Sequence, residues 1–197
     1  LGSVVPALTG RVLGALQMLC SARLLTVGPG LKSGIKLRLD NPAQLGAELL
    51  CGAVAALAEG PGPLAVISAD TAISIMAVNA KQELVGGVIL PGPQLSLSAL
   101  VQKTAQLPQI DLSAPASSSI LGKNTSACLQ NGFVLGTAGL LDGLAERFQA
   151  ELGPDIRFYA TGNLPRTIRE ACRTPIEYRE YLITDGLYRI WQKNRKG

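Results

Sequence analysis

The stretch GPGPLAVISADTAISIMAVNAKQELVGGVILPGP, residues 60–93, decides the fold of this 197-residue chain. It opens with alternating glycine and proline, which end the element in front of them. Three short apolar runs rich in β-branched residues follow, at 64–68, 73–78 and 84–90. Residues 79–82 are typical of a hairpin turn between the last two. The stretch therefore predicts a meander of three strands, closed by Pro91-Gly92-Pro93.

Helical patterns alternate with further short strands on both sides of this meander. Before it we expect a strand at 2–6, a helix capped by Thr9 that runs to Cys20, a strand at 24–27 ended by Gly28-Pro29-Gly30, and a helix capped by Asn41 that ends near Gly60. After it we expect a helix around 97–104, a loop at 111–119, a long helix at 125–152, a strand at 156–161, a helix after Pro165 and a last helix at 184–194. The sum is an α/β fold.

Composition excludes several kinds of site. The chain has no histidine, so a Ser-His-Asp triad, a Cys-His dyad and a His-ligated zinc site are excluded. The four cysteines form no Cys-x-x-Cys pair, and we expect them to be small buried side chains in a reducing cytoplasm. No apolar run reaches the ~18 residues of a membrane span, so no membrane partner is expected.

The net charge of +4 comes from the C-terminal part of the chain. Residues 1–153 hold nine basic and nine acidic side chains, whereas residues 154–197 hold nine basic and five acidic ones. The densest basic run is 192–196. A nucleic-acid surface would need a larger basic patch with interleaved aromatics, so the run favours a solvated helix end.

The predicted helix at 125–152 carries a face of four glycines, Gly132, Gly136, Gly139 and Gly143. Each costs roughly 1 kcal/mol of helix stability relative to alanine. Such a face allows another helix to approach closely. Two interpretations remain open, close packing inside one subunit and a helix at a dimer interface.

Three glycine-bearing turns follow predicted strands: Gly86-Gly87 with Pro91-Gly92, then 122–125, and then Thr161-Gly162-Asn163. Turns that lead into helix N-termini suit anions because free backbone N–H groups converge there. None matches a Walker A loop or a Rossmann fingerprint. Each could be an ordinary loop, but a phosphate donor together with a small anionic acceptor would account for all three.

The order of these motifs resembles the type III pantothenate kinase family, of the acetate-kinase/Hsp70/actin superfamily. The stretches that carry the resemblance are Ser3-Val4-Val5-Pro6, 27–30, Asp40-Asn41-Pro42 with Gly46-Ala47, 86–92, 95–108, 120–125 and Ala160-Thr161-Gly162. They run nearly from end to end of the chain.

The resemblance implies an actin-like (ribonuclease H-like) duplicated-domain fold. Residues 1–60 would be the remainder of the N-terminal domain and residues 61–197 the C-terminal domain. The family opens with an Asp-x-Gly-Asn-Thr phosphate loop, so we expect that segment to be missing in front of Leu1 and the N-terminal domain to be incomplete. Family members are homodimers that phosphorylate pantothenate with ATP, Mg²⁺ and a monovalent cation, K⁺ or NH₄⁺, on the route to coenzyme A.

The family's Gly-x-Asp-Arg motif supplies a catalytic base and a contact to pantothenate. Here it is Gly46-Ala47-Glu48-Leu49, so the resemblance implies Glu48 as the base, one methylene longer than aspartate. Leu49 cannot pair with the substrate's carboxylate. Leu39 replaces a tyrosine of the family, and Thr125 is retained for pantothenate. Without the resemblance, Glu48 would be a solvated carboxylate and Thr125 a helix cap.

The second phosphate motif, Asp-x-Gly-Thr-Ala-Thr in the family, falls on 68–73. Ser68 replaces the aspartate that would hold the monovalent cation. Asp70 replaces a glycine, and its charge would repel ATP unless Mg²⁺ lies between them, although a simple turn residue is the alternative. The resemblance implies that Thr71, Thr161 and Gly162 contact ATP. Asn163 stands in place of a further glycine.

The resemblance thus predicts a pantothenate kinase. The departures at Glu48, Leu49, Ser68 and Asp70 keep open a catalytically impaired paralogue that binds ligand or a partner subunit. A third alternative is a transcription-accessory protein like Bvg accessory factor, a member of the same family, supported here only by the basic C-terminal tail.

Overall fold

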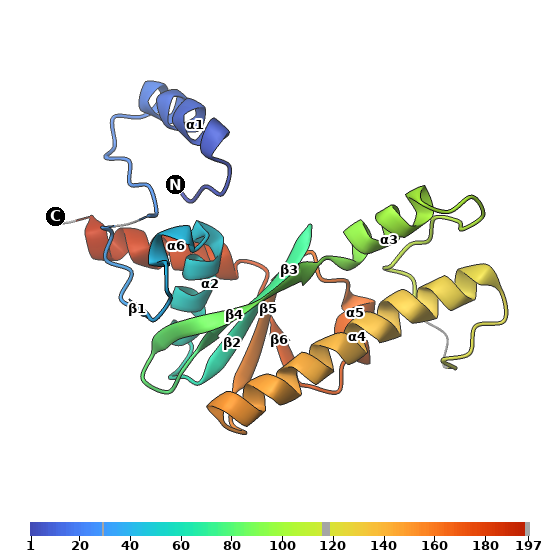
Figure 1. Cartoon of the computed structure of the whole chain (residues 1–197). Coiled ribbons are helices and arrows are strands. Elements are labelled where there is room, and N and C mark those ends of the chain that lie inside the picture. The colour runs from blue at the N-terminus through green and yellow to red at the C-terminus, as the bar shows by residue number, and fades with distance from the viewer. Residues whose placement is uncertain (29, 116–118, 196–197) are drawn as a thin grey trace.

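A mixed six-stranded sheet forms the centre of the molecule in the computed structural model, which describes residues 1–28, 30–115 and 119–195 (Figure 1). The strand order is β1-β4-β3-β2-β5-β6. The bounds are β1 Lys36–Leu37, β2 Leu64–Ala69, β3 Ala72–Val78, β4 Glu83–Pro91, β5 Arg157–Gly162 and β6 Ile176–Tyr178. β2, β3 and β4 form the predicted antiparallel meander, while β5 joins β2 in parallel, β6 joins β5 and β1 joins β4.

One face of the sheet is covered by two helices, α2 Ala47–Ala58 and α6 Leu182–Asn194. Leu64, Val66 and Tyr159 point to this face and pack into the same core as the two helices. The helices approach closely, because a side chain at Gly186 of α6 would collide with the carbonyl oxygen of Cys51 in α2. The sheet therefore holds α2, which precedes the predicted boundary at residue 60, in one core with the C-terminal helix.

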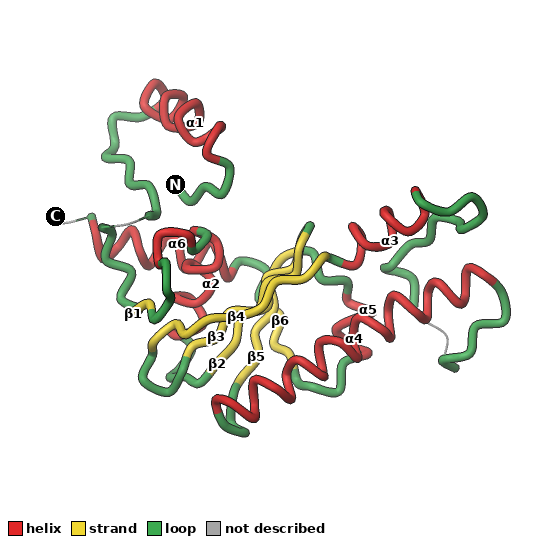
Figure 2. Tube along the Cα trace, viewed as in Figure 1, coloured by secondary structure: helices red, strands yellow, loops and turns green. Residues whose placement is uncertain are grey.

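The other face is covered by α4 Thr125–Leu152 and α5 Arg166–Ala171. Its strand residues alternate with those of the first face, since Ala65, Ile67 and Phe158 pack against α4 and α5. β2 is therefore buried on both faces, which explains its unbroken apolar sequence. A further helix, α3 Pro93–Gln102, continues from the end of β4 and projects beyond the sheet beside α4 (Figures 1 and 2).

The N-terminal part differs most from the sequence prediction. The strand expected at 2–6 is wrong, because the chain enters α1, Pro6–Leu19, directly, with Val5 rather than Thr9 as the N-cap residue. The Thr9 hydroxyl instead donates to the carbonyl of Val5. In Figure 1 α1 lies apart from the sheet, and its Met18 and Leu19 are more than 80% exposed.

The strand expected at 24–27 is also wrong: this segment has no strand assignment, although Leu25 and Val27 each share one backbone hydrogen bond with Leu1. Nor does Asn41 cap an α-helix. It precedes a 3₁₀ turn, η1 Pro42–Gln44, and α2 begins at Ala47 behind Gly46.

The remaining helices lie where the sequence predicts them. α4 has the predicted bounds, α5 follows Pro165, and α6 begins two residues earlier than expected. Residues Pro29, 116–118 and Lys196 of the predicted turn, loop and tail lie outside the described part of the chain. Within that part, no helix is long and apolar enough to cross a membrane.

The expectation for the cysteines holds in part. Cys51 is buried and Cys172 half-buried, and burial raises the pKa of each thiol to about 11. Cys20 and Cys128 are exposed, contrary to expectation, because each lies near the end of a helix that extends away from the core.

Candidate functional site

Two predicted nucleotide motifs meet at one edge of the sheet. β2 and β5 run in parallel and end side by side, with Ala69 paired to Gly162. The turn after β2 carries Asp70 and Thr71, and the turn after β5 carries Asn163. Carboxyl ends of parallel strands are where α/β sheets bind ligands. The fold thus joins motifs that lie about 90 residues apart in the sequence.

The two turns pack so closely that glycine is required between them. Gly162 has a φ of +81°, and a side chain there would collide with the carbonyl oxygen of Ala69. The Asn163 N–H donates to the same oxygen. On the other side of the β2–β3 turn, a side chain at Gly92 would collide with the carbonyl oxygen of Asp70. Three backbone segments therefore converge here.

A pocket of about 410 Å³ opens where these segments meet. Its lining combines the two turns with the start of α3, namely Asp70, Thr71, Pro93, Gln94, Leu95, Ser98, Asn163 and Pro165. The first backbone N–H groups of a helix have no partner within it, and they attract anions. The contribution of Gln94, Leu95 and Ser98 was missed by the sequence reasoning, although Gly92-Pro93 before an apolar periodic run signals a helix start.

Asp70 and Asn163, which both line this pocket, are joined to each other by their side chains. Asn163 Nδ2 donates to Asp70 Oδ1 over 3.0 Å. Both side chains are exposed to solvent. The two residues that the resemblance places at glycine positions of the family thus contact each other.

Thr161 and Gly162, at the end of β5, are held by hydrogen bonds to the segment at β6. Thr161 is only 1% exposed, and its hydroxyl donates to the carbonyl of Glu180 over 3.4 Å. The Tyr178 hydroxyl donates to the carbonyl of Gly162 over 2.8 Å. Arg169 stacks over the Tyr178 ring at 4.0 Å. The β5–α5 turn is therefore held by β6 as well as by β2.

Glu48 lies at the same edge of the sheet but on the α2 side. α2 leads directly into β2, and Gly52 packs against Val66, so the first turn of α2 points toward the carboxyl end of β2. Glu48 is exposed and lines a separate pocket of about 210 Å³ with Cys51, Ile183 and other residues. The structure does not bring Glu48 into the pocket of Asp70.

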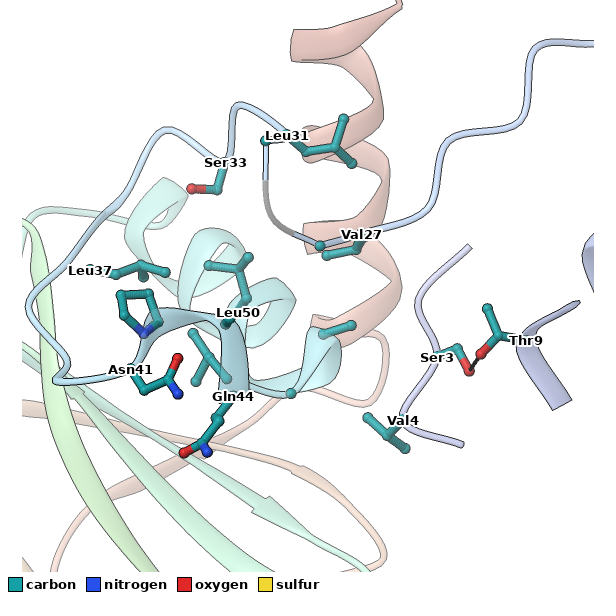
Figure 3. A pocket seen from close by; sticks show the side chains of 17 residues that line it. Ser3, Val4, Thr9, Val27, Leu31, Ser33, Leu37, Asn41, Gln44 and Leu50 are labelled. Atoms are coloured by element: carbon teal, nitrogen blue, oxygen red, sulfur yellow. Dashed lines mark hydrogen bonds between the residues drawn. The ribbon is translucent and has the colours of Figure 1, made fainter. Parts of the chain in front are cut away.

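Gly46 and Ala47 line a larger cavity of about 1030 Å³ between the start of α2 and the N-terminal segments (Figure 3). Its labelled side chains include Val27, Leu31, Leu37, Asn41, Gln44 and Leu50. Leu39 and Leu49 are partly buried and pack against the core under α2. Neither leucine presents a polar group to a ligand.

Thr125 and Gly86-Gly87 lie away from the 410 Å³ pocket, whereas Gly92 of the same motif packs against the Asp70 turn. Thr125 is exposed at the start of α4, where the neighbouring Asn124 is the cap and accepts from the Ala127 N–H over 2.9 Å. It is absent from the lining of the 410 Å³ pocket. Gly86 and Gly87 lie within β4, where a side chain at Gly87 would collide with the carbonyl oxygen of Ile75, so they serve the sheet.

Among the described residues, no group of three or more aspartate, glutamate or cysteine side chains is placed to bind a metal ion. A magnesium ion carried by a nucleotide needs only one or two carboxylates beside the phosphates. Asp70 fits this role, because one of its oxygens is oriented by Asn163 and the side chain faces the pocket. Ser68 offers only a neutral hydroxyl and does not fit as a charged ligand for a monovalent cation.

A family model described as type III pantothenate kinase matches residues 1–147. The chain belongs to the type III pantothenate kinase family. A type III pantothenate kinase of Koribacter versatilis is 35% identical over 99% of this chain and 70% of its own length. One of Dehalococcoides mccartyi strain BAV1 is 38% identical over 98% of this chain and 73% of its own.

Solved structures give the fold of this family member. A putative Baf family transcriptional activator from Campylobacter jejuni superposes with a TM-score of 0.58 at 18% identity, covering 98% of this chain and 81% of its own. The ADPNP-bound activator of 2-hydroxyisocaproyl-CoA dehydratase from Clostridium difficile gives 0.51 at 13%, covering 99% and 84%. The actin-like α/β fold predicted from the sequence is confirmed.

Proposed function

We propose that this chain phosphorylates the 4′-hydroxyl of pantothenate with ATP, the first step of coenzyme A biosynthesis. Membership of the type III pantothenate kinase family carries the proposal. The convergence of both nucleotide motifs on one pocket supports it, since phosphoryl transfer depends mainly on positioning and on neutralising charge.

The nucleotide end of the site is the 410 Å³ pocket. The phosphates bind at the start of α3 and at the β2–β3 turn, where Thr71 donates its hydroxyl. Gly162 allows the second turn to approach, and Thr161 keeps that turn in place from the interior. Mg²⁺, when bound with ATP, neutralises phosphate charge, and Asp70 would hold it.

The acceptor end lies at the first turn of α2. Glu48 accepts the proton of the pantothenate hydroxyl as general base. Gly46 and Ala47 let the substrate approach the backbone beside it, and Thr125 contacts pantothenate as in the family. Leu39 and Leu49 form apolar contacts only, so recognition of the substrate's carboxylate falls to other groups.

A homodimer completes the proposal. Gly132, Gly136 and Gly139 have nothing within 4 Å of where a side chain would be, and Gly132 and Gly136 line a pocket of about 260 Å³ with the start of α3, so this face of α4 has room for another helix. Leu140 beside them is 44% exposed. We assign this face to a second copy of the chain. The four free thiols agree with a reducing compartment, and we place the reaction in the cytoplasm.

The division into an N-terminal domain at 1–60 and a C-terminal domain at 61–197 stays part of the proposal. A monovalent cation, K⁺ or NH₄⁺, is retained as a requirement by family resemblance, with no ligand assigned to Ser68. The catalytically impaired paralogue is favoured by one observation, the placement of Glu48 outside the pocket of Asp70.

The test is formation of phosphopantothenate by the chain with ATP, Mg²⁺ and K⁺, compared with Glu48→Gln and Glu48→Asp. Loss of a general base costs about 100-fold or more in kcat, so Glu48→Gln is expected to be nearly inactive. Glu151→Gln, an exposed glutamate on α4, is the matched control and should keep full activity.

Activity of Glu48→Gln equal to that of the parent would remove Glu48 from the mechanism. A silent parent would favour the impaired paralogue. Recovery of activity in Glu48→Asp would then place the defect at the length of this one side chain.

A further inference from the structure

The carboxylate of Asp70 is oriented but not neutralised. Asn163 Nδ2 donates to its Oδ1, and the backbone holds both residues, since Asp70 N–H donates to the carbonyl of Ala72 and Asn163 N–H to that of Ala69. Among the described residues, no lysine or arginine forms an ion pair with Asp70. An oriented negative charge therefore faces the 410 Å³ pocket.

This charge sits beside groups that attract anions. The start of α3 lines the same pocket with Gln94 and Leu95, and a helix N-terminus carries about half a positive charge. A polyphosphate in the pocket would be attracted by α3 and repelled by Asp70. A divalent cation on the phosphates would turn that repulsion into attraction, because a carboxylate and phosphate oxygens together are typical magnesium ligands.

We propose that Asn163 is a positioning residue that holds the Asp70 carboxylate toward the phosphates, so that the pocket accepts ATP almost only as its magnesium complex. The proposal rests on the proposed nucleotide site and adds a selectivity to it. The two side chains in contact, Asp70 and Asn163, stand at positions where the family pattern has glycines.

The size of the effect follows from Coulomb's law. One carboxylate and two phosphate charges about 6 Å apart in water repel by an amount equal to about tenfold in affinity. Salt screens exposed charges, so the measurement belongs at low ionic strength. Removal of the Asp70 charge should tighten binding of magnesium-free ATP by about this factor and weaken binding of the magnesium complex.

The experiment measures the dissociation constant of a fluorescent ATP analogue for the full chain by anisotropy, once in EDTA and once in excess Mg²⁺. The dissociation constant in EDTA is divided by that in Mg²⁺, and this ratio is compared for the parent, Asp70→Asn, Asn163→Ala and the double variant. Asp155→Asn removes an exposed charge just before the start of β5, at the opposite end of that strand from Asn163, and is the matched control. Asp70→Asn keeps the size of the side chain and so keeps the fold.

The parent and Asp155→Asn are expected to prefer the magnesium complex by about tenfold or more. Asp70→Asn should bring the ratio near one, and Asn163→Ala should lower it by about threefold through loss of orientation. The double variant should match Asp70→Asn, because Asn163 acts only through Asp70. A ratio unchanged by Asn163→Ala, with a lower melting temperature, would make the pair a purely structural contact and overturn the proposal.

The outcomes separate this inference from the proposed function. Pantothenate phosphorylation with an unchanged ratio in all variants would refute the inference alone. The expected ratios without any phosphopantothenate would refute the kinase activity alone. Absence of analogue binding in both buffers would refute both, since each requires a nucleotide in this pocket.

Discussion

The carboxylate of Asp142 in α4 accepts the backbone N–H of Arg173, which lies in the loop between α5 and β6, at 3.0 Å on both oxygens. The neighbouring Thr174 N–H donates to Oδ1 at 2.9 Å. Asp142 is 3% exposed. This one side chain thus fixes the segment that leads into β6, and β6 in turn holds the β5–α5 turn of the nucleotide pocket through Tyr178.

Replacement of Asp142 by alanine should lower the free energy of unfolding by about 1–3 kcal/mol, because the backbone N–H groups of Arg173 and Thr174 lose their buried carboxylate acceptor. Urea unfolding followed by circular dichroism measures this. Glu146→Ala, which removes an exposed partner of the Arg173 side chain, is the control and should cost less than about 0.5 kcal/mol. Equal effects of the two variants would show that Asp142 is no anchor.

The same carboxylate should make the fold sensitive to acid. Burial by itself would raise the pKa of Asp142, but the N–H groups of Arg173 and Thr174 outweigh it and hold the pKa below its usual value. A lowered folded-state pKa gives stability that is present above the unfolded pKa, near 4, and is lost as the pH falls through the folded value. The melting temperature of the parent should therefore drop below about pH 4 more steeply than that of Asp142→Asn.

Gly162→Ala should damage both stability and nucleotide binding. Its φ of +81° disfavours alanine, and the new methyl group would collide with the carbonyl oxygen of Ala69. Gly153, with a φ of +105° and open space around it, is the matched control. We expect about 1 kcal/mol of destabilisation for Gly153→Ala and about 3 kcal/mol for Gly162→Ala. Equal losses of stability in Gly153→Ala and Gly162→Ala would show that the β2–β3 and β5–α5 turns do not pack closely.

Tyr178→Phe should weaken the nucleotide pocket indirectly, through the β5–α5 turn. It deletes the hydroxyl that donates to the Gly162 carbonyl over 2.8 Å and leaves the stacked Arg169 in place. A loss of about 1 kcal/mol in stability is expected, together with weaker nucleotide binding. Tyr181→Phe, whose side chain is 65% exposed, should leave both properties unchanged. Thermal shift with and without Mg·ATP separates the two effects.

The central meander was predictable because its signals are local. Glycine and proline bound the meander at its two ends, at 60–63 and 91–93. The turn at Asn79 is closed by its own side chain, which accepts from the N–H groups of Lys81 and Glu83. β1 and β6, in contrast, have two and three residues and depend wholly on their neighbours β4 and β5. Such strands are too short to show a periodicity.

The N-terminal strands were mispredicted for a related reason. The apolar segments at 2–6 and 24–27 have strand-like composition, but a strand forms only against a partner. Here only Leu1, just before the first segment, exchanges two backbone hydrogen bonds with the second, at Leu25 and Val27, and no sheet forms between the described residues of the two segments.

The family motifs predicted individual residues of the candidate site but not the contacts between them. The contact of Asp70 with Asn163 needed the parallel register of β2 and β5, which the sequence does not display. The contribution of α3 to the same pocket depends likewise on where β4 ends against β3, with Pro91 paired to Ala72.

The open glycine face of α4 predicts how a second copy would respond to mutation. Gly139→Arg places a bulky charge where nothing lies within 4 Å in one subunit, so the fold of the monomer should persist and gain helix propensity by up to about 1 kcal/mol. A dimer through this face should dissociate to the 20.5 kDa monomer. Light scattering coupled to size-exclusion chromatography measures the mass, with Glu151→Arg, exposed on the same helix outside the glycine face, as control. A parent that is already monomeric, or a Gly139→Arg variant that stays dimeric, would assign the glycines to something other than self-association.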